Sequence, residues 1–119
     1  MTTLAQSVEA LSEHGHVIKH LGVQIAKVEN PQTGFSRRLR RPLMLKAVWG
    51  GNYWVVSGTV SLAHGTAPAL EEAVADYMRD WEERLRLLED GEPDLSAPVL
   101  HELQAMRRAM VVVPTTNAD

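Results

Sequence analysis

Four arginines within five consecutive positions are the residues whose types and spacing most directly indicate chemistry. They are Arg37, Arg38, Arg40 and Arg41. A guanidinium group presents several donors in one plane and binds phosphate or carboxylate through paired hydrogen bonds. Phe35, Trp49 and Trp54 are near in sequence and have flat rings on which bases could stack. The segment therefore predicts a surface that binds a partner or phosphate through the four arginines and Trp54.

The charge balance of the chain gives that surface two interpretations. The formal net charge is −3 and the sequence pI is about 5.9. Residues 35–58 carry five basic residues and no acidic one, whereas residues 59–95 carry ten acidic residues and three arginines. Such blocks complement each other within one molecule or across a symmetric dimer. Domains that bind nucleic acid usually have a net basic surface, so we expect a protein partner, with nucleic acid as the alternative.

Three histidines near the N-terminus form a second group of candidate residues. His14, His16 and His20 follow one another closely, and imidazoles so placed could bind zinc or nickel. A site of three histidines needs side chains that converge, which a helix end followed by a strand does not guarantee. We therefore expect surface histidines and no cofactor, with a metal site as the alternative.

Residues that could form a catalytic triad are present but lack a recognisable arrangement. His64 could act as a general base near Asp76, with Ser57 or Ser61 as the nucleophile. Neither serine lies in a nucleophile elbow. The glycine-rich residues 50–52 do not precede a helix, so they lack the free amides of a phosphate loop. The sequence therefore predicts a protein that is not an enzyme.

The segment before the histidines is predicted to be a helix. Leu4, Val8 and Leu11 recur at helical spacing. Thr3 suits the N-terminal cap, and Gly15 suits a left-handed stop.

The middle of the chain has the pattern of an antiparallel sheet. Leu21, Val23 and Ile25 alternate with smaller or polar residues, and residues 30–34 combine Asn, Pro and Gly in a turn. The arginine segment projects side chains to both faces, so it cannot be central in a dry sheet. The predicted strands cover residues 16–26, 35–41, 43–49 and 53–56, with 59–62 as a continuation or a fourth strand.

Two helices are predicted toward the C-terminus. The first follows Pro68 and carries apolar residues at spacings of three or four, namely Leu70, Val74, Tyr77, Trp81, Leu85 and Leu88. Ser96 suits the cap of a second, with Val99, Leu103, Met106 and Met110 on one face. We thus expect one α+β domain over residues 1–114: an N-terminal helix, about four antiparallel strands, and two C-terminal helices on one face of the sheet. Residues 115–119 are expected to be a frayed tail.

The size and composition of the chain fit that architecture. It has 119 residues, 45% of them hydrophobic, and no cysteine. A domain of this size buries enough surface to fold without disulfides or metal. No signal peptide and no membrane-length apolar run are evident, so we expect a cytoplasmic protein that does not act at a membrane.

Residues 43–90 resemble the HicB-like antitoxin pattern. The likeness rests on a strand and Gly-Gly turn followed by Tyr53-Trp54-Val55-Val56, Gly65-Thr66 and Leu70-Glu71-Glu72-Ala73. That family has a partly degenerate RNase H-like β-β-β-α arrangement and neutralises a small ribonuclease. This chain differs in its long N-terminal extension, in three extra residues before residue 70, and in lacking room for a ribbon-helix-helix tail. The resemblance therefore implies a fold and a class of partner, but no individual functional residue.

Together these observations predict a small non-catalytic protein-binding module, such as an antitoxin, an inhibitor or an assembly subunit. A homodimer is expected, because the arginine segment and the acidic helix suit a two-fold exchange. The alternative is an accessory protein that binds nucleic acid through Arg37, Arg38, Arg40 and Arg41.

Overall fold

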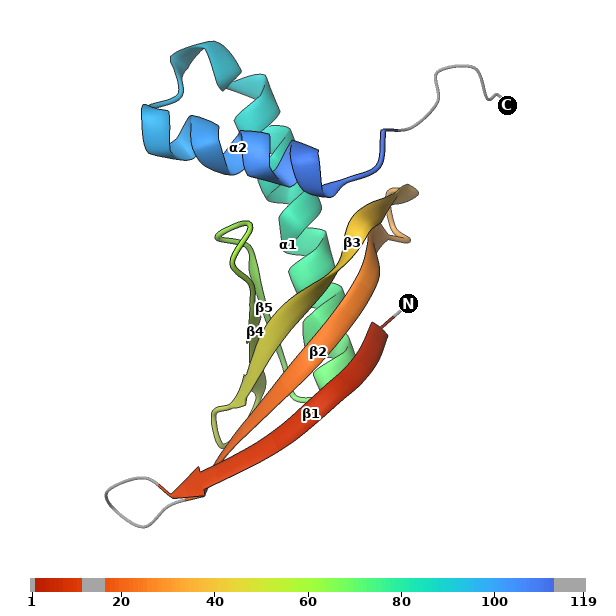
Figure 1. The fold of residues 1–119 in the computed structure, drawn as a ribbon, viewed down its shortest axis with the longest axis vertical. Helices are drawn as coiled ribbons and strands as arrows, with labels where there is room; N and C mark the ends of the chain where they lie inside the picture. Colours follow the sequence, from red (N-terminus) through yellow and green to blue (C-terminus); the bar gives the residue numbers. More distant parts are fainter. Residues whose placement is uncertain (1, 12–16, 113–119) are drawn as a thin grey trace.

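Five antiparallel strands and two α-helices make up the described part of the chain. The computed structural model describes residues 2–11 and 17–112. The elements are β1 (Thr2–Leu11), β2 (Val17–Asn30), β3 (Phe35–Trp49), β4 (Trp54–Ser57), β5 (His64–Ala67), α1 (Leu70–Asp90), a short 3-10 turn (Glu92–Asp94) and α2 (Ala97–Ala109). Each strand pairs with the next in a single sheet (Figure 1). The predicted α+β class is confirmed.

The predicted N-terminal helix is wrong, because residues 2–11 form strand β1. β1 pairs with β2 in a register that places Thr3 opposite Gln24 and Leu11 opposite Val17. Spacings of three and four are short-range signals, and pairing with a long neighbouring strand overrides them. The sheet therefore has five strands rather than about four. Gly15 and the expected tail at residues 115–119 lie outside the described residues.

The strands predicted between residues 16 and 56 are confirmed as β2, β3 and β4, and the structure differs from the prediction in two places. β3 runs through Pro42 without ending, and residues 59–62 form a loop that leads to β5. The predicted turn between β2 and β3 is confirmed: the Asn30 side chain accepts a hydrogen bond from the Gln32 amide at 3.2 Å, and Gly34 has φ 78°. Over residues 43–90 the elements follow the β-β-β-α order that the antitoxin resemblance implies.

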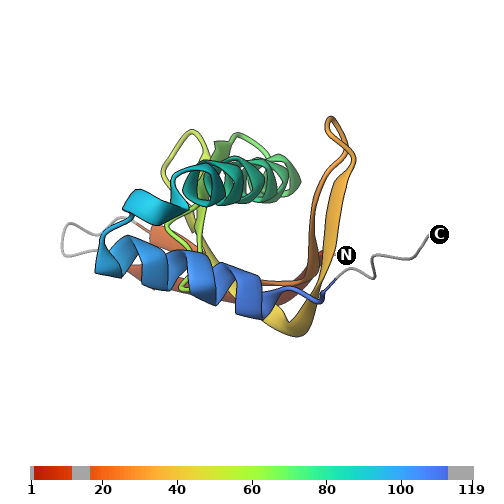
Figure 2. The same cartoon turned by 90° about the horizontal axis from the view of Figure 1, so that it is seen from above.

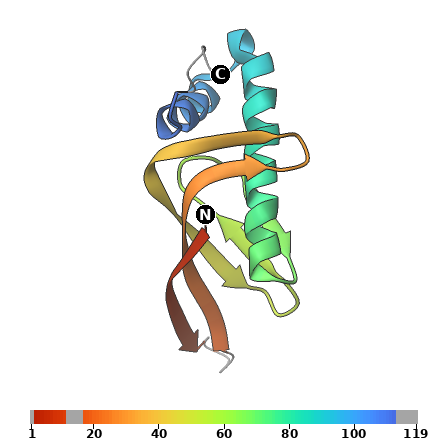
Figure 3. The same cartoon turned by 90° about the vertical axis from the view of Figure 1, so that its right-hand side faces the viewer.

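A large bulge bends β2 and β3 in the middle. Ile25 pairs with Leu43, but the next pair joins Lys27 to Arg38, so residues 39–42 stand opposite Ala26 alone. Pro42 has no amide hydrogen to give to a ladder, which suits such an interruption. Beyond the bulge, the two strands turn and cross over α1 (Figures 2 and 3). We call this part, residues 27–38, the arm.

Helix α1 packs against the sheet and provides much of the core. Its predicted apolar stripe is confirmed, since Val74, Tyr77, Trp81, Leu85 and Leu88 are buried. The stripe meets the inner face of the sheet, where the buried residues are Val23, Ile25, Leu45, Ala47 and Val56. None of the helices in the described part of the chain is both long and apolar enough to cross a membrane.

Helix α2 contacts α1 and β3, and its Glu102 carboxylate connects it by hydrogen bonds to α1 and to the loop after β4. Glu102 accepts hydrogen bonds from Arg84 Nη2 at 2.7 Å, Ser61 Oγ at 2.9 Å and the Leu62 amide at 2.9 Å. After α2, Met110 forms a bridge with Leu39 of β3. The end of α2 is thereby held against the bulge.

Candidate partner-binding groove

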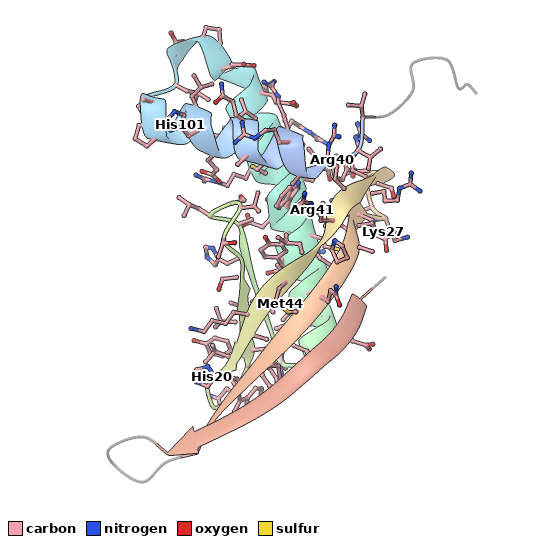
Figure 4. All side chains as sticks on the ribbon, in the orientation of Figure 1. His20, Lys27, Arg40, Arg41, Met44 and His101 are labelled. Atoms are coloured by element: carbon pink, nitrogen blue, oxygen red, sulfur yellow. The ribbon has the colours of Figure 1, made fainter. Side chains whose placement is uncertain are left out.

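Two of the predicted arginines line a groove between β3, the loop after β4 and the end of α2. Its volume is about 540 Å³, and its lining consists of Leu39, Arg40, Arg41, Pro42, Leu43, Val60, Arg108 and Ala109. The floor is apolar, and the charged groups are three guanidiniums. Figure 4 shows Arg40 and Arg41 where β3 passes the C-terminal end of α2. Arg108 was not predicted from the sequence, because only folding brings the last turn of α2 to the bulge.

The guanidiniums of the groove are not neutralised by carboxylates. Arg40 Nε donates a hydrogen bond to the Met110 carbonyl at 3.2 Å, which fixes the direction of that side chain. Arg41 and Arg108 are exposed. No Asp or Glu is among the described residues that line the groove, so its charge is uniformly positive. Such a site attracts carboxylate or phosphate.

The predicted pairing of the arginine segment with α1 is not found within the described chain. Four of the acidic side chains in and just after α1 have other partners: Asp76 pairs with Arg79, Glu82 with Arg86, and Glu89 and Glu92 with Arg107. None of Arg37, Arg38, Arg40 or Arg41 forms an ion pair with a described carboxylate. Pairing across a dimer remains a prediction.

The bulge distributes the other two predicted arginines to different surfaces. The Arg37 guanidinium lies over the Phe35 ring, 5.0 Å from its centroid, and borders a hollow of about 210 Å³ beside Glu82 and Glu89. Arg38 is exposed and stands opposite Lys27 on β2. Arg40 and Arg41 therefore line the groove, whereas Arg37 and Arg38 do not.

Trp54 lies away from the arginines. It packs on Trp49 with ring centroids 5.3 Å apart, next to the turn that joins β3 and β4. Trp49 follows Arg41 by eight positions along β3, which is about 25 Å at the usual rise of a strand. The tryptophans consequently do not offer stacking platforms beside the groove.

A buried carboxylate holds the arm in place. Glu82 Oε1 accepts hydrogen bonds from Asn30 Nδ2 and Thr33 Oγ1, each at 2.8 Å, and Oε2 pairs with Arg86. Burial acts to raise the pKa of Glu82, but the hydrogen bonds from Thr33 and Asn30 and the charge of Arg86 outweigh it and lower the pKa. The four-residue spacing of Glu82 and Arg86 predicted their ion pair, which is confirmed. The sequence placed it on the outer face of the helix, whereas Glu82 is buried beneath Asn30 and Thr33, which are about fifty residues away in the chain.

The catalytic candidates have structural roles instead. The amides of His64 and Thr66 on β5 donate to Asp80 at 2.9 Å and to Asp76 at 3.0 Å. Ser61 Oγ donates to Glu102. The carboxylates of α1 thus cover the outer edge of β5, which would otherwise offer unpaired amides to other chains. Among the described residues, neither Ser57 nor Ser61 is hydrogen-bonded to His64, whose Nδ1 lies 3.1 Å from the Leu62 carbonyl oxygen.

The histidine candidates are only partly described. His20 is half-buried on β2 opposite Val48, while His14 and His16 lie outside the described residues. Within residues 2–11 and 17–112, no group of three or more His, Asp or Glu side chains could hold a metal ion.

No family model, curated protein or solved structure matches this chain. The resemblance of residues 43–90 to HicB-like antitoxins therefore stays a prediction.

Proposed function

We propose that this protein is a non-catalytic protein-binding module and that the groove is where it contacts its partner. The module is of the antitoxin, inhibitor or assembly-subunit type, so its partner is another protein. The observation that carries the proposal is the composition of the groove: an apolar floor surrounded by three arginines with no carboxylate among its described lining residues. An apolar floor suits protein side chains, whereas the arginines suit acidic ones.

The proposal is tested by capture with matched variants. Tagged full-length chain is incubated with nuclease-treated lysate of the organism that encodes it, alongside the double variant Arg41→Glu/Arg108→Glu. Lys46→Glu is the control for reversal of a charge at one exposed position of β3 outside the groove lining, and the double variant reverses two such charges. We expect one stoichiometric protein that binds the wild type and the control but not the double variant. Equal capture by all three chains would refute the proposal.

Nucleic-acid binding is the second candidate function, and one observation favours it. Arg37, Arg38, Arg40 and Arg41 form no ion pair with a described carboxylate, so their charge is available to phosphate. Replacing all four by Ala should then abolish binding to nucleic acid, and the wild type should lose affinity steeply with salt because phosphate contacts release counterions. Binding that survives the substitution removes this candidate.

A further inference from the structure

The edge of β3 beside the groove is interrupted. On that edge β4 pairs with residues 46–49, and Met110 forms its bridge with Leu39. Residues 40–45 lie between these contacts, and none of them has a strand partner on that side in the described part of the chain. Residues 40–42 of this gap belong to the bulge, and residues 43–45 continue the regular strand with an unpaired edge. An unpaired stretch of strand edge is a template for a segment from another chain.

The groove opens at this same gap. Leu43 and Pro42 belong to the gap itself, while Val60 and Ala109 face it from the loop and from α2. The groove volume lies within the range of about 300 to 1,000 Å³ that ligand pockets occupy. Main-chain pairing and side-chain recognition are therefore available to the same bound segment.

Charge restricts what that segment can be. Arg41 and Arg108 are exposed on opposite walls of the groove, one from β3 and one from α2. Arg40 is already engaged by the Met110 carbonyl. A segment with a carboxylate would pair with Arg41 and Arg108, whereas a basic segment would be repelled.

We propose that the groove receives an extended acidic segment of a partner protein, which adds to β3 at residues 43–45, where the regular strand resumes after the bulge. Its apolar side chains lie on the floor formed by Leu43, Val60 and Ala109, and its carboxylates lie between Arg41 and Arg108. Main-chain pairing provides affinity, and the side-chain pockets provide selectivity, as in other cases of strand addition. This inference rests on the proposed function and names the chemistry of its partner.

Alternatives for the same place fit less well. A nucleic-acid strand would leave the apolar floor unfilled, and the described aromatic residues do not line the groove. In the acidic helix of the same chain, Asp76, Glu82 and Glu89 pair with arginines outside the groove, and none of the described carboxylates of α1 lines the groove. A partner helix could present carboxylates to the arginines but would not pair with the edge of β3.

The test uses fluorescent ten-residue peptides and the full-length chain. One peptide alternates valine with glutamate, and a matched peptide alternates valine with lysine. We expect saturable binding of the glutamate peptide and at least tenfold weaker binding of the lysine peptide, measured by fluorescence anisotropy. Equal binding of both peptides, or no binding of the glutamate peptide, overturns the proposal.

Backbone methylation separates strand addition from simple attraction of charge. Two further glutamate peptides carry N-methyl groups on alternate residues, one on the odd and one on the even positions. An added strand faces β3 with one edge only, so one methylated peptide should lose at least tenfold in affinity while the other retains binding. If both bind as the parent does, the segment is not an added strand.

Variants place the peptide in the groove. Arg41→Glu/Arg108→Glu should weaken binding of the glutamate peptide at least tenfold, and Lys46→Glu should leave it unchanged. Failure of the two tests can be told apart. If the double variant loses the captured protein but methylation does not change peptide binding, strand addition is overturned and the proposed function stays intact. Loss of groove-dependent capture counts against the proposed function itself.

Discussion

At the scale of single residues, Gly65 sets how closely α1 approaches the sheet. A Cβ atom at this position would lie 2.3 Å from the Ala73 carbonyl oxygen and 2.3 Å from the Tyr77 amide nitrogen. Both are backbone atoms, so the helix itself would have to move. The close approach also brings Asp76 and Asp80 within reach of the β5 amides.

Gly65→Ala should therefore lower the free energy of unfolding by about 3 kcal/mol, at the upper end of the range for overpacked cores. Urea denaturation followed by circular dichroism measures the change. Gly50→Ala is the matched control, since its added Cβ would meet nothing closer than 3.5 Å. A loss for Gly65→Ala no larger than that for the control would contradict the close contact.

For Tyr77 we expect a substitution that raises the free energy of unfolding rather than lowering it. Its hydroxyl is buried and has no hydrogen-bond partner among the described residues, and burial raises the pKa of Tyr77 well above its usual value. A buried polar group without a partner opposes folding. Tyr77→Phe should raise the free energy of unfolding by about 1 kcal/mol, seen as a higher thermal midpoint. A clear loss of stability would show that the hydroxyl has a partner in solution.

At the scale of elements, the arm depends on two features that lie far apart in sequence. The four-residue bulge turns β2 and β3, and Glu82 of α1 then holds their connecting turn through Asn30 and Thr33. The first feature sets the direction of the arm and the second fixes its end. Arg40 and Arg41 lie at the bend, so the groove depends on both.

Glu82→Gln should lower the free energy of unfolding at pH 7 by about 2 kcal/mol, because an amide cannot match the three donors that the carboxylate accepts. The folded-state pKa of Glu82 is lowered, so its stabilisation is present above the unfolded pKa and is lost as pH falls through the folded pKa. The wild type and the variant should therefore converge in acid, as measured by urea denaturation from pH 7 to pH 3. A difference that does not depend on pH would argue against an ionised Glu82.

At the scale of the whole molecule, the groove has walls from three segments, and Glu102 joins two of them to α1. It links α2 to the loop at Ser61 and Leu62 and to Arg84. The Arg84 hydrogen bond is the largest influence and lowers the pKa of Glu102 from 4.5 to about 2, although burial opposes it. The link should consequently persist in mild acid.

Glu102→Gln should loosen α2 and thereby remove Arg108 from the groove. We expect faster amide hydrogen exchange across residues 97–109 and weaker binding of the partner, although Arg41 and Arg108 are unchanged. In the wild type the contribution of Glu102 is present above pH 5 and is lost between about pH 5 and pH 2, since its folded pKa is depressed. Unchanged exchange in α2 would show that apolar packing and the ion pairs of Arg107 with Glu89 and Glu92 hold it without Glu102.

Part of the architecture was predictable because it depends on short-range periodicity. The apolar spacing of α1 and the alternation of Leu43, Leu45 and Ala47 predict which faces of these two elements are buried. Both predicted faces pack in the core. The N-terminal segment was not predictable, because its apolar spacing suits a helix and only pairing with β2 makes it a strand. The position of β5 was not predictable either. The strand lies at His64–Ala67, where Gly65 allows it to approach the backbone of α1 closely.

The sequence by itself determined the α+β class, the buried faces of α1 and of the second half of β3, and the segregation of charge, all of which follow from residue order. Tertiary structure decided which charges remain unpaired and where they meet. It separated Arg37 and Arg38 from Arg40 and Arg41, and it added Arg108. The physical reason is that the register shift between β2 and β3 and the path of α2 depend on contacts between residues far apart in the chain, which local patterns do not encode.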